Sequence, residues 1–311
     1  MSQKPTVLVT GATGAQGGSV ARVLLANNKF HVRVLTRNTS SANAIALAQQ
    51  GAEPVQGDLE NVDSLKSAME GCYAVFGVTN FWEHFENEYR QGKNLVDAVA
   101  QSNIKHFVFS TLPDYYKLSH GQLAVPHCDI KAALQQYTKD LKIPSTFIHV
   151  AFYYENFSNF FPLQKGEDGN YYFGFPQGDT PLSMVSAEDV GGVVATILDF
   201  PQAYIGRTVG VVGEDRPCTE YAAIMSKVLG VNIYYNHIPR DTYAAFGFPG
   251  AEELADMFEV QRLYIPSRRN SLIETYGLNP STQTFEQWLL KNKALFNIQP
   301  SHRLQTASEK L

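Results

Sequence analysis

A short β-branched run near the start of the chain leads into a glycine-rich turn and then into a helical pattern. The run is Thr6–Thr10, and the helical pattern continues from Ser19. The turn between them has the spacing G-x-x-G-x-x-G, in which the glycines permit a tight turn, the approach of a pyrophosphate and close helix–strand packing. The helix N-terminus adds N–H donors and the positive end of the helix dipole. A Rossmann-type dinucleotide site is therefore predicted at Gly11, Ala12, Thr13, Gly14, Ala15, Gln16 and Gly17.

Further strand-like runs alternate with helical patterns through the first half of the chain, which is typical of βαβ units on a parallel sheet. One helical pattern has clear local signals, because Asn61 can cap its first turn and Gly71 ends it. The predicted fold class is α/β, a Rossmann doubly wound parallel sheet with helices on both faces. The predicted strands after the first are His31–Thr36, Glu53–Gln56, Ala74–Thr79, Lys105–Ser110 and Thr146–Val150.

The second half of the chain predicts a smaller C-terminal α+β lobe. Residues 152–181 are aromatic and rich in glycine and proline, which indicates a long irregular segment suited to a cleft wall. Ser186 and Asp189 resemble a capping box for a helix that runs to about Phe200, and Arg207–Val212 is a predicted strand of the main sheet. Further helical patterns cover Thr219–Leu229, Pro249–Leu263 and Thr284–Lys293.

These patterns predict one compact unit with two lobes in a chain of 311 residues. Residues 1–151 are assigned to a dinucleotide-binding Rossmann domain, whose sheet is continued by about residues 183–213. Residues 152–182 and 214–298 are assigned to the smaller lobe. Residues 299–311 are polar and lack periodicity, so we expect a flexible tail.

The end of the second predicted strand decides which dinucleotide fits. A carboxylate there would bond the ribose hydroxyls of NAD, whereas a cation would pair with the additional phosphate of NADP. This sequence has Arg37 and no carboxylate, so NADP(H) is the predicted cofactor, with NAD bound more weakly. A solvated surface arginine is the alternative interpretation of Arg37. The predicted contacts to the 2′-phosphate are Arg37, Asn38, Thr39, Ser40 and Ser41.

Composition argues against several other classes of protein. The 25 basic and 30 acidic residues are spread through the chain, so we expect no direct nucleic-acid binding. Three cysteines without close pairing argue against a disulfide framework, and the eight histidines lack metal-ligand spacing. No apolar stretch approaches about 18 residues, so we expect no membrane span. The first strand begins almost at the initiator Met, which predicts a cytoplasmic protein and leaves the nucleus open.

Motifs beyond the glycine turn resemble those of a known family. The glycine spacing, Thr36-Arg37 and Gly57-Asp58-Leu59 together resemble the NmrA-like family of atypical short-chain dehydrogenases. Further motifs look especially like the animal NADP-sensing branch of that family, and the resemblance covers about residues 4–298. These motifs are Val78-Thr79-Asn80-Phe81-Trp82, Gln91-Gly92-Lys93, His127-x-x-x-Lys131, Tyr153-Tyr154-Glu155-Asn156 and Gly247-Phe248-Pro249-Gly250-Ala251.

The resemblance implies further cofactor contacts. Asp58 stands where relatives bind the adenine amino group, with Leu59 packed beside the base. A turn role for Asp58 and a core role for Phe81 and Trp82 are the alternatives. The other implied contacts lie at the riboses and phosphates, at a basic position near the cofactor, and around the nicotinamide. They are Thr79, Asn80 and Phe81; Arg90; and Tyr153, Tyr154, Glu155 and Asn156.

Short-chain dehydrogenases reduce carbonyls with a Ser, a Tyr that donates the proton, and a Lys four residues after the Tyr. Here Ser110 closes the fifth predicted strand and Lys131 stands in the lysine place, but the tyrosine place is His127. Imidazole is shorter than phenol, so Ser110, His127 and Lys131 are predicted to form a vestigial triad. Lys131 is still assigned to the nicotinamide ribose, and a buried packing histidine is the alternative for His127.

An intact cofactor motif beside an incomplete triad leads to one hypothesis and one rival. The hypothesis is a non-catalytic NADP(H)-binding regulator that couples the NADPH/NADP level to its conformation and to protein partners. The rival is an NADPH-dependent reductase of a quinone or a small carbonyl. The sequence leaves the partner and the oligomeric state open, a homodimer included.

Overall fold

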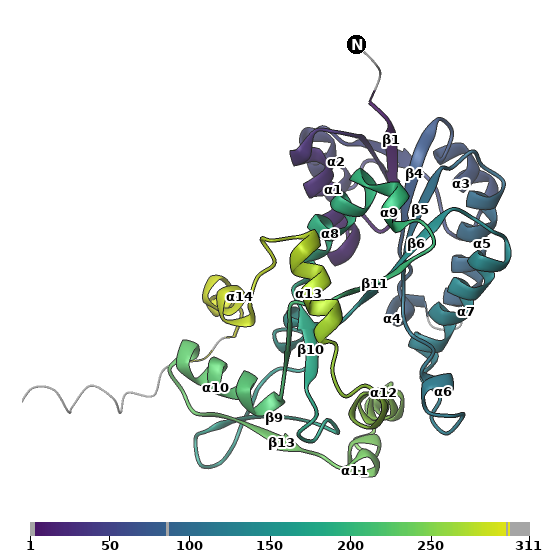
Figure 1. Ribbon diagram of the computed structural model, residues 1–311. Coiled ribbons are helices and arrows are strands. Elements are labelled where there is room, and N and C mark those ends of the chain that lie inside the picture. The colour runs from purple at the N-terminus through teal and green to yellow at the C-terminus, as the bar shows by residue number, and fades with distance from the viewer. Residues whose placement is uncertain (1–3, 85–86, 297, 299–311) are drawn as a thin grey trace, which may run out of the picture. The chain divides into compact units, whose positions relative to one another are not determined.

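The computed structural model describes residues 4–84, 87–296 and 298 (Figure 1). The chain divides into two compact units, and each unit has its own sheets. The predicted boundary differs from this division at three places, since residues 183–186 and residue 213 fall in the second unit and residues 268–282 in the first. The first unit comprises Met1–Ala151, Ala187–Val212 and Arg268–Thr282, and the second comprises Phe152–Ser186, Gly213–Ser267 and Gln283–Leu311.

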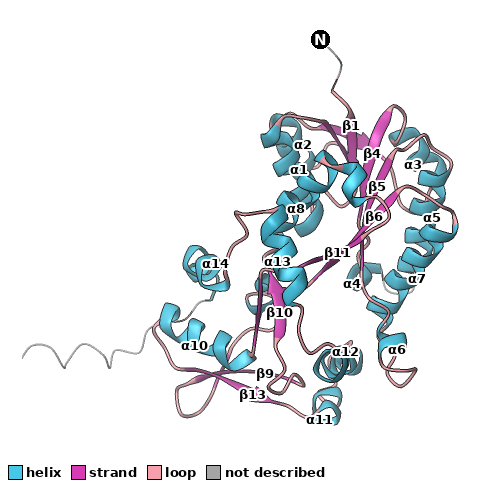
Figure 2. Cartoon of the chain, in the orientation of Figure 1, coloured by secondary structure: helices cyan, strands magenta, loops and turns pink. Residues whose placement is uncertain are grey.

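A seven-stranded parallel sheet forms the centre of the first unit, in the order β11-β6-β5-β4-β1-β2-β3 (Figure 2). The predicted doubly wound Rossmann sheet is therefore confirmed. Strand order reverses between β1 and β4, and ligands of such sheets bind outside the carboxyl ends of the strands at this switch point. The strands are β1 (Thr6–Val9), β2 (His31–Thr36), β3 (Glu53–Gln56), β4 (Cys72–Gly77), β5 (His106–Thr111), β6 (Ser145–Val150) and β11 (Thr208–Val211).

Helices cover both faces of this sheet (Figure 1). α3, α5 and α7 lie on one face, and α1, α8 and α13 lie on the other. This part of the class prediction is also confirmed. The helices of the unit are α1 (Ala15–Asn27), α2 (Ala42–Gln49), α3 (Val62–Ala68), α4 (Phe81–His84), α5 (Glu88–Ala100), α6 (Tyr115–Leu118), α7 (Pro126–Asp140), the 3-10 turn η3 (Ala187–Asp189), α8 (Val190–Asp199), α9 (Pro201–Tyr204) and α13 (Arg269–Leu278).

Local signals placed some element ends correctly and missed others. Asn61 accepts a hydrogen bond from the Ser64 N–H and caps α3, as predicted. β4 ends at Gly77, earlier than predicted, so Thr79 lies in the turn that follows the strand. The helix predicted from Ser186 begins later, because the 3-10 turn η3 precedes α8.

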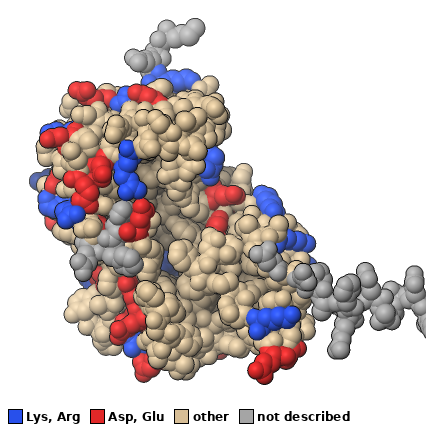
Figure 3. Space-filling view, turned by 180° about the vertical axis from the view of Figure 1, so that it is seen from behind, with Lys and Arg blue, Asp and Glu red and all other residues tan. Residues whose placement is uncertain are grey.

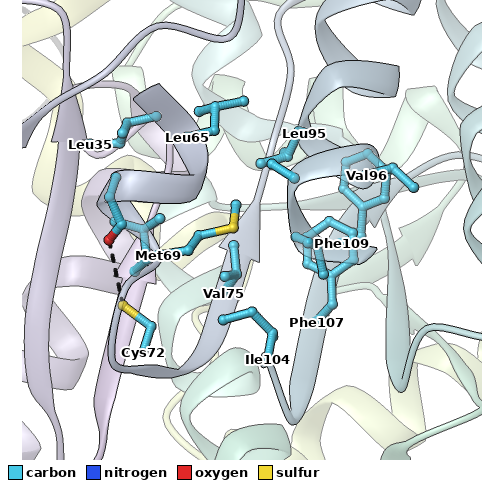
Figure 4. Close-up of a cluster of buried hydrophobic side chains, with 14 of the residues drawn as sticks. Leu35, Leu65, Met69, Cys72, Val75, Leu95, Val96, Ile104, Phe107 and Phe109 are labelled. Atoms are coloured by element: carbon cyan, nitrogen blue, oxygen red, sulfur yellow. Dashed lines mark hydrogen bonds between the residues drawn. The ribbon is translucent and has the colours of Figure 1, made fainter. Parts of the chain in front are cut away.

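A cluster of buried side chains packs α3 and α5 against β4 and β5 (Figure 4). The rings of Phe107 and Phe109 stack with centroids 4.8 Å apart, and Leu65, Val75 and Leu95 are fully buried beside them. Burying one such side chain stabilises a fold by about 1.5–3 kcal/mol relative to leaving it exposed. The cluster therefore fixes the two strands whose carboxyl ends lead into the site described below.

The second unit contains two three-stranded sheets, β12-β10-β7 and β13-β9-β8. The prediction of an irregular segment over residues 152–181 is wrong in part, because β7, β8 and β9 lie within it. Its aromatic residues form a core in which the rings of Phe175 and Phe258 stack at 4.5 Å. The elements are β7 (Phe152–Tyr153), η2 (Tyr154–Phe157), β8 (Gln164–Lys165), β9 (Tyr171–Phe175), β10 (Leu182–Val185), β12 (Glu214–Arg216), α10 (Cys218–Leu229), β13 (Ile233–His237), α11 (Arg240–Ala244), α12 (Ala251–Tyr264), α14 (Phe285–Asn292) and η4 (Lys293–Phe296).

The predicted continuation of the main sheet over residues 183–213 is correct for one strand only. β11 pairs in parallel with β6 in the seven-stranded sheet. β10 instead pairs with β7 and β12 in the second unit. The predicted flexible tail over residues 299–311 lies outside the described residues.

Candidate functional site

The glycine turn between β1 and α1 is shaped as a phosphate loop. Gly11 has a φ of 60°, and the Gly14 N–H donates to the Gly11 carbonyl at 2.9 Å. Gly17 is buried against the turn, where a Cβ would lie 2.4 Å from the carbonyl oxygens of Gly11 and Thr10. Gly11, Thr13 and Gly14 are exposed. The turn is thus closed toward the helix and open toward solvent.

The start of α1 fits an anionic ligand. No side chain caps the helix at Gly14, and the first N–H groups of a helix have no partner within it. These donors and the positive end of the helix dipole attract phosphate. Among the described residues, a Cβ at Gly14 would meet only the Gly11 oxygen within 4 Å, at 3.4 Å, which leaves space for a pyrophosphate before it.

Arg37 lies at the end of β2, and its guanidinium contacts a carboxylate that the sequence analysis did not predict. Arg37 Nη2 donates to Glu83 Oε1 at 3.2 Å, and Asn80 Nδ2 donates to Glu83 Oε2 at 3.2 Å. Arg37 and Glu83 are both more than half exposed, so the pair is weak, and the phosphate contact of Arg37 stays a prediction. The structure therefore brings Arg37 and Asn80 to one place.

The other predicted 2′-phosphate contacts follow Arg37 directly. Ser41 caps α2 by accepting the Ala44 N–H, and Asn38 Oδ1 accepts the Ser40 N–H within the loop. Asn38, Thr39 and Ser40 are exposed. Ser41 thus has a structural role of its own, while the loop before it is open to solvent.

Replacing Arg37 with alanine should lower NADP affinity selectively. A charge-assisted hydrogen bond contributes about 1.5–3 kcal/mol, which corresponds to a loss of about 10- to 150-fold. NAD lacks the phosphate, so its affinity should change little. Calorimetry with both dinucleotides measures the effect, and Arg207→Ala is the matched control because Arg207 is an exposed arginine paired with Glu274. Equal losses for NADP and NAD would contradict the assignment.

Asp58 lies in the turn before α3, and Arg90, which belongs to α5, contacts the same turn through Glu60. Asp58 Oδ1 accepts the Glu60 N–H at 3.0 Å, which is the turn role considered for this residue. Arg90 Nε donates to Glu60 Oε2 at 2.8 Å, and Gln91 donates to the other oxygen of Glu60. Leu59 packs against the hydrophobic cluster. The adenine contacts of Asp58 and Leu59 and the cofactor contact of Arg90 stay predictions.

The three residues of the predicted vestigial triad occupy the end of β5 and the start of α7. Ser110 Oγ donates to Gln16 Oε1 at 2.7 Å, so the serine bonds to the phosphate-loop segment. The His127 ring is buried, with its centroid 5.9 Å from that of Phe81 and 5.5 Å from that of Trp82. Lys131 lies one helical turn after His127.

The Lys131 ammonium contacts a buried carboxylate that the sequence analysis missed. It forms an ion pair with Glu88, the first residue of α5, and donates to Thr79 Oγ1 at 3.0 Å. The structure therefore joins two predicted cofactor contacts, Lys131 and Thr79, through Glu88. No local signal marks Glu88, because it lies 43 positions before its partner.

A second group of hydrogen-bonded side chains, which the sequence analysis also did not predict, lies where β5 and β6 end. The Gln135 amide oxygen accepts the Thr111 hydroxyl at 2.7 Å and lies 2.9 Å from His149 Nε2. Burial lowers the pKa of His149 to about 4, so this imidazole is neutral near pH 7. A neutral histidine here offers hydrogen bonding rather than charge.

The four predicted nicotinamide contacts belong to the second unit. The Tyr154 ring is fully buried, 5.1 Å from Phe285 and 5.8 Å from Trp288, and its hydroxyl donates to the Gln283 carbonyl at 3.3 Å. Glu155 accepts a hydrogen bond from Ser186. Tyr153 and Asn156 are half-buried. Contacts from these residues to a nicotinamide stay predictions.

Other kinds of site find no support in the described part of the chain. Among residues 4–84, 87–296 and 298, no cluster of three or more His, Cys, Asp or Glu could hold a metal ion. No helix in the same residues is long and apolar enough to cross a membrane. The three cysteines are buried free thiols. On the face drawn in Figure 3, basic and acidic side chains are interspersed.

The parallel sheet and the phosphate-type loop at its switch point define an α/β protein of the Rossmann class. Within that class, the chain belongs to the NmrA-like family, which matches residues 3–289. The family predicted from the motifs is therefore confirmed.

Relatives of similar sequence are described as NmrA-like family domain-containing proteins, and several of them as oxidoreductases. An NmrA-like family domain-containing protein of Dictyostelium discoideum is 31% identical over 247 residues, 76% of this chain and 81% of that protein. The NmrA-like family domain-containing oxidoreductase FrzB of Cladobotryum sp is 31% identical over 273 residues, 81% of either protein.

Solved structures show the same fold. NmrA, a negative transcriptional regulator solved in complex with NADP, matches with a TM-score of 0.81 at 26% identity, covering 93% of this chain and 95% of its own. The NADPH-dependent quinone oxidoreductase QOR2 of Escherichia coli matches with a TM-score of 0.75 at 22% identity, covering 94% of this chain and all of its own.

Proposed function

We propose that this protein is an NADP(H)-binding regulator, which binds the dinucleotide without reducing a substrate and couples the NADPH/NADP level to its conformation and to protein partners. One observation carries the proposal: an open phosphate loop with Arg37 nearby stands beside a site where His127 replaces the proton-donating tyrosine. The solved complexes of NmrA with NADP and with NAD support the choice of ligand. The proposal assigns the protein to the cytoplasm or the nucleus.

The cofactor site in this proposal is formed by residues of the first unit. The amides of the glycine loop and the start of α1 would hold the pyrophosphate, and Arg37 would hold the 2′-phosphate. Bound NADPH would supply a hydride, but reduction of a carbonyl also needs a proton donor near the nicotinamide. His127 is shorter than tyrosine and is packed beside Phe81 and Trp82, so it is poorly suited to that role.

An NADPH-dependent reductase is the second candidate. It is favoured by relatives that are described as oxidoreductases, such as the protein lnaB of Aspergillus flavus, which is 32% identical over 270 residues. In this alternative a quinone or a small carbonyl is the substrate, and the His127 imidazole is the proton donor.

NADPH oxidation by the wild-type protein separates the two candidates. We expect NADPH to bind without any substrate-dependent loss of its absorbance against a panel of quinones and carbonyls. His127→Ala should leave the NADPH affinity nearly unchanged, because the imidazole is not part of the proposed phosphate site.

A reductase would give the opposite result. Removing a general acid slows turnover by about 10²–10⁴-fold, and the pH profile of the wild type would report titration of an imidazole. Robust NADPH oxidation that His127→Ala abolishes would therefore refute the regulator and establish the second candidate. His120→Ala is the control substitution, since His120 lies outside the proposed site.

A further inference from the structure

The ammonium group of Lys131 is surrounded by acceptors from its own unit. Nζ lies 3.0 Å from Thr79 Oγ1 and 3.4 Å from the Thr79 carbonyl oxygen, and it forms an ion pair with Glu88 Oε1. An ammonium group has three N–H donors. The three acceptors match these three donors in number, so a ribose hydroxyl would have to displace one of them.

The carboxylate in this network is more deeply buried than the lysine. The Glu88 side chain is 0% exposed and that of Lys131 is 13% exposed. Glu88 Oε1 also accepts the Thr79 hydroxyl at 2.6 Å, whereas Oε2 has no hydrogen-bond partner among the described residues. An ion pair attracts more strongly in such surroundings than at the surface. The Lys131 ammonium is therefore held firmly on Glu88.

Glu88 itself has a fixed place in the fold. It is the first residue of α5, where the positive end of the helix dipole favours a carboxylate. α5 packs against α7, which carries Lys131. The network thus links α5, α7 and the turn after β4, and the last of these contains the predicted ribose and phosphate contacts Thr79 and Asn80.

We propose that Glu88 is a positioning residue that withdraws Lys131 from the nicotinamide ribose in the ligand-free protein. The inference rests on the proposed NADP(H)-binding function and deepens it. To bond the ribose, Lys131 must give up part of its contact with Glu88. Glu88 therefore lowers the affinity for the nicotinamide half of the dinucleotide, while the glycine loop and Arg37 bind the other half unaffected.

Glu88→Gln tests the inference, because a neutral amide keeps the shape of the side chain but holds an ammonium less strongly. We expect the dissociation constant of NADPH to fall by about three- to tenfold, the net size of one ordinary hydrogen bond. Adenosine 2′,5′-bisphosphate lacks the nicotinamide ribose, so its affinity should not change. Calorimetry measures both ligands.

Two further variants show whether the effect passes through the lysine. Adding Lys131→Met to Glu88→Gln should remove the gain in NADPH affinity. Glu53→Gln is the matched control, since Glu53 pairs with Arg33 and His31 and stands at the start of β3, at the opposite end of the strands from the glycine loop. It should leave both ligands unaffected.

Thermal unfolding supplies a readout that does not depend on the cofactor. If the pair is formed, Lys131→Met alone should destabilise the protein more than the double variant does, because it leaves a buried carboxylate unpaired. Glu88→Asp, which keeps the charge but shortens the reach, provides a second variant if Glu88→Gln folds poorly, and it should also tighten NADPH binding.

The outcomes separate this inference from the proposed function. An NADPH affinity unchanged or weakened by Glu88→Gln, or a gain that persists without Lys131, overturns the role of Glu88 and leaves the proposed function standing. A wild-type protein that binds neither NADPH nor adenosine 2′,5′-bisphosphate overturns the proposed function, and the role of Glu88 fails with it.

Discussion

Gly14→Val is expected to abolish dinucleotide binding while the protein stays folded. Gly14 has a φ of -96°, which any residue adopts, and it is exposed at the N-cap of α1. A Cβ there would come no closer than 3.4 Å to the Gly11 oxygen. The added side chain would therefore fill the space that the pyrophosphate needs, and the loss of several phosphate contacts should weaken binding by about 100-fold or more.

Titration of NADPH fluorescence measures this loss, and thermal unfolding checks the fold. Gly277→Val is the matched control, because Gly277 lies on α13 in the same unit and a Cβ there meets no atom of the described residues within 4 Å. The control should bind NADPH as the wild type does. Normal NADPH binding by Gly14→Val would mean that the phosphate site lies elsewhere.

Gly17→Ala should fail in a different way, with stability and binding lost together. A Cβ at Gly17 would lie 2.4 Å from the carbonyl oxygens of Thr10 and Gly11. Both atoms belong to the backbone between β1 and α1, so neither can turn aside as a flexible side chain does. Overpacking of this kind costs about 1–3 kcal/mol and occasionally more, and we expect the upper end of that range.

The free energy of unfolding from denaturant titration, together with the NADPH dissociation constant, tests this prediction. Gly277→Ala makes the same chemical change where there is open space, and there it should stabilise α13 by up to about 1 kcal/mol. Opposite signs at the two glycines are expected. If Gly17→Ala kept the wild-type stability and affinity, the close packing of α1 on β1 would not hold in solution.

The two glycines show how one motif contains two kinds of constraint. Gly17 is required by the packing of a helix on a strand, and that requirement exists without any ligand. At Gly14 the protein itself has room for a side chain, and we expect that side chain to collide only with a bound phosphate. A comparison of the two variants therefore separates the fold from the function.

Several features of the site could be predicted because their signals are local. The strand, the glycine turn and the start of α1 all lie between Thr6 and Asn27. Arg37 follows β2 directly, and Asn61 precedes the helix that it caps. Steric limits on the backbone and capping act over a few residues, so composition and spacing are sufficient to reveal them.

The tertiary structure alone decided which distant side chains meet. Glu83 contacts Arg37 although the two residues are 46 positions apart in the sequence, and Glu88 contacts Lys131 across 43 positions. β9 likewise pairs along its whole length with β13, which follows it by more than 50 residues, and only its start pairs with the neighbouring β8. An ion pair or a parallel strand needs a partner, and the order of strands and helices in the fold determines which distant residue becomes that partner. The residues next to it in the sequence do not show which one it is. The sequence by itself determined the Rossmann class and the phosphate loop, whereas the packing of α5 and α7 determined what holds the lysine.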